Sequence, residues 1–127
     1  MPVTIDWSLT VQAAGEAPVA ISSQVQVDAY DRINVTVAQG AGDFEISVQP
    51  GGAGKVRLLL VRSSVYGPNL TYKVNAAANP AHALDDVLFL TGQGGVETLG
   101  FPPNSLLFSN TLGQDATIDI LVGRQAS

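Results

Sequence analysis

The chain has 127 residues and a mass of 13.2 kDa, which is the size of one domain. Its hydrophobic content of 46% excludes intrinsic disorder, and the absence of cysteine excludes disulfides, thiolate catalysis and cysteine-based metal centres. A net charge of −5 argues against binding to nucleic acid or to an anionic membrane, and the charged fraction of 13% is about half of the usual quarter.

The first residues show neither the basic segment nor the apolar segment of a signal peptide. The longest apolar run, Leu58 to Val61, is far shorter than the roughly 20 residues that a membrane helix needs. We therefore expect a soluble protein. The sequence leaves its compartment open, with the cytoplasm and a virion as the two candidates.

Apolar and polar residues alternate from Val3 to Val11, which predicts a strand with one face on a core and the other in water. The small residues 14–18 end this strand. Apolar positions resume at Ile21 and continue at Val25, and we expect a β-bulge between them, near Ser22 and Ser23.

Alternating strands follow at 33–37, 44–48 and 70–74, separated by turns that contain glycine or proline. The segment 55–61 differs, because its nearly continuous apolar sequence predicts burial on both faces. Residues 75–83 are expected to form a loop.

A second continuous apolar strand is predicted at 87–90, and the glycines at 92–95 end it. Short strands are expected at 96–99 and 106–108, and a closing strand at 116–122. Nine or ten short strands without a helical period predict an all-β fold: a single-domain antiparallel β-sandwich over residues 1–127, with jelly-roll-like connections.

Motifs for catalysis are weak. The glycine-rich segments 50–57 and 92–95 do not complete a phosphate-binding or dinucleotide-binding motif. His82, the only histidine, precedes Asp85 and Asp86, but no nucleophile accompanies it, and we expect an exposed loop residue. No catalytic residue, metal ligand or cofactor is therefore predicted, and the chain is expected not to be an enzyme. A calcium site assembled from separate loops stays open.

Aromatic residues give the second hypothesis. Most of them occupy apolar positions of strands and are expected in the core, including Trp7, Phe44 and Phe89. Tyr30, Tyr66 and Phe101 are instead expected in turns, where they could contact a ligand or a partner. The alternative hypothesis for the function is therefore a carbohydrate-binding β-sandwich module that binds its ligand through these three residues.

The few cations are unevenly distributed, since Lys55, Arg57, Arg62 and Lys73 fall within one stretch. If their strands share an edge, they form a charged interface patch that favours head-to-tail association. The alternative is ordinary surface charge that protects edge strands from aggregation.

Assembly is the leading hypothesis. The two continuous apolar strands and the segment 99–103 supply more apolar surface than a small, sparsely charged monomer hides. We therefore expect a non-enzymatic structural subunit that self-associates as a homo-oligomer, a trimer, and serves in a virion or another larger protein assembly.

Overall fold

The structure, a computed structural model, describes residues 3–48, 55–100 and 103–125. In these residues the chain forms ten β-strands and one short helix, arranged in three antiparallel sheets. Their bounds are β1 Val3–Val11, β2 Val19–Val27, β3 Ala29–Val37, β4 Phe44–Ser47, β5 Lys55–Ser63, β6 Gly67–Val74, β7 Ala81–Leu84, β8 Leu88–Thr91, α1 Gly92–Glu97, β9 Ser105–Asn110 and β10 Ala116–Gln125. The predicted all-β sandwich is confirmed.

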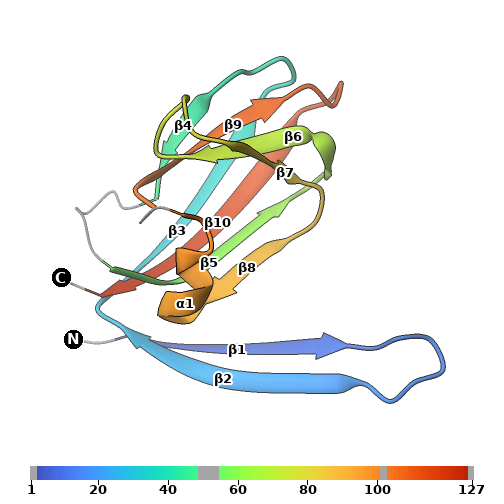
Figure 1. The fold of residues 1–127 in the computed structure, drawn as a ribbon, viewed down its shortest axis with the longest axis vertical. Helices are drawn as coiled ribbons and strands as arrows, with labels where there is room; N and C mark the ends of the chain where they lie inside the picture. The colour runs from blue at the N-terminus through green and yellow to red at the C-terminus, as the bar shows by residue number, and fades with distance from the viewer. Residues whose placement is uncertain (1–2, 49–54, 101–102, 126–127) are drawn as a thin grey trace.

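Strands β3 to β10 form the sandwich, whose two sheets have the orders β3-β10-β5-β8 and β4-β9-β6-β7 (Figure 1). The antiparallel pairs are nested along the chain: β3 pairs with β10, β4 with β9, β5 with β8 and β6 with β7. The eight strands are thus one long hairpin folded over on itself and closed by the pairs β10–β5 and β6–β9. This is the strand order of a jelly roll.

The core lies between the two sheets and follows the alternation of each strand. On β10 the side chains of Ile118, Ile120 and Val122 point inward and are fully buried, as is Phe108 on β9. Phe44 departs from the prediction, since its side chain is 43% exposed at the start of the edge strand β4.

Strand β5 is buried on both faces, as its continuous apolar sequence predicts. Leu59 and Val61 belong to the core between the sheets. Leu58 is only 2% exposed although it lies outside that core cluster, on the opposite face of the sheet. Leu58 pairs with Gly123, where an added Cβ would meet Ile5 and Val27, so the hairpin formed by β1 and β2 packs on this outer face of the β3-β10-β5-β8 sheet.

The hairpin β1–β2 precedes the sandwich and is separate from both of its sheets. In Figure 1 it runs along one end of the sandwich and extends well past β8 and α1. Only Asp28 separates β2 from β3, and its backbone N–H donates to the Arg124 carbonyl at 2.9 Å.

Three further local predictions are wrong. Residues 81–83, expected to belong to a loop, are part of the edge strand β7, so His82 is a strand residue. The expected bulge near Ser22 and Ser23 is absent, because β1 and β2 pair in an unbroken register of nine residue pairs with Trp7 opposite Ser23. Residues 92–97, expected to be a glycine turn leading into a strand, form α1. Val96 and Leu99 are three residues apart and both are buried, which holds this short helix on the sandwich.

Candidate functional site

The most distinctive surface is the apolar face of the hairpin. The register places Val3, Ile5, Trp7, Leu9 and Val11 opposite Val27, Val25, Ser23, Ile21 and Val19. Residues opposite each other in an antiparallel pair share a face, so all of these side chains project to the same side. The other face carries polar residues such as Thr4, Asp6 and Gln24.

The half of this face nearest the sandwich, here called the proximal face, consists of Ile5, Trp7, Val25 and Val27. Trp7 contacts Phe89 of β8 edge-on, and Val27 is 1% exposed. A glycine at position 123 makes the close approach possible, because a Cβ there would lie 2.8 Å from Ile5 Cδ1 and 3.2 Å from Val27 Cγ1. The proximal face is therefore anchored on the sandwich.

The other half, the distal face, consists of the two outer rungs of the hairpin. Leu9 and Ile21 are 44% and 49% exposed, and Val11 and Val19 are 58% and 60% exposed. Along β2 the exposure rises from 1% at Val27 to 60% at Val19, toward the turn, where the hairpin extends past β8 (Figure 1). In the part of the chain that the structure describes, the distal face is thus a surface of four aliphatic residues, each between 44% and 60% exposed.

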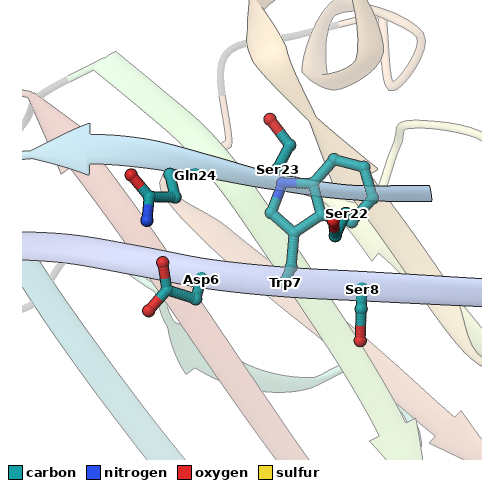
Figure 2. A pocket seen from close by; sticks show the side chains of 6 residues that line it. All are labelled: Asp6, Trp7, Ser8, Ser22, Ser23 and Gln24. Atoms are coloured by element: carbon teal, nitrogen blue, oxygen red, sulfur yellow. The ribbon is translucent and has the colours of Figure 1, made fainter.

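A hollow of about 440 Å³ lies along the middle of the hairpin, between the two halves. Figure 2 shows its lining: Trp7 and Ser23 project to one side of the ribbon and Asp6 and Ser8 to the other. Ser22 and Gln24 complete it. The lining offers hydroxyl, amide and carboxylate groups for hydrogen bonds, with neither a histidine nor a cation among them.

Of the three turn aromatics expected to contact a ligand, the two that the structure describes lie near opposite ends of β10. Tyr30 is 42% exposed but belongs to β3, where it pairs with Gly123 near one end of β10. Tyr66 lies beyond the other end of that strand, and its hydroxyl accepts a 3.1 Å hydrogen bond from the Ser63 backbone N–H. Phe101 is outside the described residues.

The four cations expected in one patch are divided between the two sheets. Lys55, Arg57 and Arg62 lie on β5, whereas Lys73 lies on β6 of the other sheet, where its ammonium is 3.0 Å from an Asp43 carboxylate oxygen. The condition that their strands share an edge is not met, because β5 and β6 are both interior strands of different sheets.

Arg62 instead belongs to a cluster with Arg32 and Asp119 on the sandwich surface. The Asp119 carboxylate accepts hydrogen bonds from Arg32 at 3.1 and 3.3 Å and from Arg62 at 3.0 Å. The Arg32 hydrogen bond, supported by that of Arg62, lowers the pKa of Asp119 below its ordinary value, although burial acts in the opposite direction. The two arginines therefore stabilise the charged form of this carboxylate.

His82 is exposed on the edge strand β7 and packs against Tyr72, with ring centroids 5.4 Å apart. Across residues 3–48, 55–100 and 103–125, no three histidine or acidic side chains gather as a metal site would require. Within the same ranges, no helix is long and apolar enough to span a membrane.

The residues of the distal face were not predicted as a site. The alternation of apolar and polar residues predicts that the whole apolar face of a strand is buried, and it does not show where the covering element ends. A signal for their exposure is present only in the lengths: two nine-residue strands make a ribbon longer than the sheet beneath it is wide. Comparisons of the chain with protein-family models, curated proteins and solved structures give no match.

Proposed function

We propose that the protein is a non-enzymatic structural subunit that self-associates and serves as a building block of a larger particle, such as a virion. The observation that carries this proposal is the distal face of the hairpin, where Leu9, Val11, Val19 and Ile21 are between 44% and 60% exposed. The largest contiguous apolar patch on the surface of a domain is often a functional contact surface.

The size of the surface supports the same proposal. The chain exposes 7047 Å², against about 6,400 Å² expected for a monomeric protein of its mass. The projecting hairpin contributes to this excess, because most residues of β1 and β2 are exposed. Only 13% of the residues are charged, so the surface has little of the charge that keeps monomers apart.

The architecture supports a role in a particle by analogy. Jelly rolls form the shells of many viral capsids and also occur in lectins and cupins, so the fold is compatible with this use without specifying it. The hairpin β1–β2, which extends beyond the sandwich, could contact a neighbouring subunit in such a particle.

Light scattering and sedimentation velocity over a dilution series test the proposal. We expect a mass that is a multiple of 13.2 kDa at high concentration and that decreases on dilution. A mass of 13.2 kDa at every concentration would contradict self-association. The trimer expected from the sequence stays a prediction that the measured mass will decide.

A further inference from the structure

We propose that the distal face of the hairpin is covered by the distal face of a second copy, with the two hairpins antiparallel and related by a two-fold axis. This inference rests on the proposed self-association and names its contact surface. It commits to a second copy of the chain as the occupant.

The composition of the distal face makes it self-complementary. Its two rungs pair Leu9 with Ile21 and Val11 with Val19, so it is aliphatic throughout. A two-fold contact places the same patch of both copies against each other. An aliphatic patch opposed by its own copy leaves no buried polar side chain without a partner.

The direction in which the side chains point determines the orientation of the second copy. Proximal and distal side chains project to the same side of the ribbon, and on that side the proximal ones meet the sandwich. A second hairpin on the distal face must therefore lie beside its neighbour's sandwich. With antiparallel hairpins the two sandwiches sit at opposite ends of the pair, whereas parallel hairpins around one axis would bring the sandwiches into collision.

Charge favours a second copy over a membrane or a nucleic acid. Residues 3–27 contain no lysine or arginine, and their acidic residues are Asp6 on the polar face and Glu16 in the turn. Amphipathic segments that bind membranes carry cations on the polar face, and nucleic-acid binders carry them in clusters. The distal face itself has no charge, so two copies meet there without repulsion.

The area indicates a dissociable contact. The four residues, 44% to 60% exposed, form a patch no larger than the largest apolar patch of an ordinary monomer, about 300–600 Å². Two faces at the lower end of that range bury less than the roughly 1,200 Å² at which stable interfaces begin. The exposed turn of residues 12–18 would lie toward β8 and α1 of the other copy and add to this area. We therefore expect the pair to separate on dilution.

A matched pair of lysine substitutions tests the surface. Val11 and Thr10 are adjacent, both are exposed, and they point to opposite faces of the hairpin. Val11→Lys places a charge in each half of the proposed contact and should raise the dissociation constant about a hundredfold or more. Thr10→Lys adds the same charge on the polar face and should change it by less than about threefold. Circular dichroism and thermal melting establish that both variants fold.

Cross-linking tests the geometry independently. The chain has no cysteine, so Val19→Cys and Ala20→Cys each introduce a single thiol on the distal and polar faces respectively. Packed sheets lie about 10 Å apart, so a short bis-maleimide should join two copies of the Val19→Cys variant and leave the Ala20→Cys variant monomeric in a denaturing gel.

The outcomes separate this inference from the broader proposal. An oligomer that persists in Val11→Lys and fails to cross-link through Val19→Cys overturns the hairpin contact and leaves self-association intact. A trimeric mass for the unmodified chain overturns the two-fold pair in the same way. A monomer at every concentration overturns both, and if that monomer binds phosphatidylcholine vesicles through Val11, the occupant is a membrane.

Discussion

The indole of Trp7 meets the ring of Phe89 edge-on, with ring centroids 5.3 Å apart and the ring planes at 67°. This contact joins the hairpin to β8, the edge strand past which the hairpin extends. An aromatic pair in this geometry adds about 0.5–1.5 kcal/mol to the burial of its surface. Trp7 therefore marks the boundary between the part of the hairpin that is anchored and the part that is free.

Phe89→Ala should loosen the hairpin. We expect a loss of about 2 kcal/mol in the free energy of unfolding, less than for a fully buried ring because Phe89 is half-buried. Trp7 is the only tryptophan, so its emission should shift to the red as its ring becomes hydrated. Urea denaturation followed by fluorescence measures both effects.

The control for this experiment is Phe44→Ala, which removes an exposed ring from β4 of the other sheet. It should leave the tryptophan emission unchanged and cost less than about 1 kcal/mol. An equal red shift in both variants would show that the fluorescence reports general loosening of the fold.

Gly123→Val should detach the hairpin from the sheet. The first added carbon would lie 2.8 Å from Ile5 Cδ1 and 3.2 Å from a Val27 methyl. Ile5 can move its terminal methyl aside, but a branched side chain also displaces Val27, at a cost of about 2–3 kcal/mol. Hydrogen exchange should accelerate in β1 and β2 while the pair β6–β9 stays protected.

Gly94→Ala provides the contrast, because a Cβ at this position in α1 would meet no atom within 4 Å. It should stabilise the protein by about 0.5–1 kcal/mol through reduced freedom of the unfolded chain. Destabilisation by both substitutions would contradict the special role of position 123.

Asp119 should make the stability depend on pH in the acid range. Its pKa in the folded protein is lowered, chiefly by the hydrogen bond from Arg32. A lowered pKa stabilises the fold above the ordinary carboxyl value of about 4, and this contribution is lost as the pH falls through the folded value. Asp119→Asn should therefore flatten the decline in stability below about pH 4, measured by urea denaturation at a series of pH values.

Arg32→Gln tests the cause of that decline. Since Arg32 provides the largest lowering of the Asp119 pKa, the variant should show a flatter acid profile even though the carboxylate remains. A profile as steep as that of the unmodified protein would assign the acid dependence to another group.

Asn110→Ala should be strongly destabilising. The side chain is fully buried, and its amide nitrogen donates to the Val37 and Gln114 carbonyls while its oxygen accepts from the Leu112 N–H. Removing it leaves three backbone groups without this partner, and we expect a loss of about 3 kcal/mol. Asn34→Ala, at an exposed position on β3, should cost less than about 0.5 kcal/mol in the same denaturation experiment.

Much of the fold could be predicted because strand alternation is a local signal. The segments around Val3–Val11 and Ala116–Val122 each show one face to a core, and the continuous apolar sequence of β5 correctly predicts burial on both faces. The sequence does not show that the outer face of β5 lies against the hairpin β1–β2 of the same chain, because this depends on how distant segments pack.

The errors have physical causes in particular side chains. Ser23 interrupts the apolar pattern of β2 without a bulge, because the register with β1 is unbroken and places Ser23 opposite Trp7. The helix α1 has two glycines among its interior residues and is held mainly by Val96 and Leu99. The exposure of the distal face depends on the width of the sheet beneath the hairpin. That width results from the pairing of distant strands and cannot be predicted from the alternation within one segment.

The nesting of the strand pairs bears on how the chain folds. The segment that separates two partners is shortest for β6 and β7 and lengthens in turn for β5 and β8, β4 and β9, and β3 and β10. Each pair that forms brings the next two strands together and shortens the loop that remains to be closed. Folding is thus expected to proceed outward from the turn at 75–80, with β10 the last strand to be ordered and a slow rate typical of distant pairings.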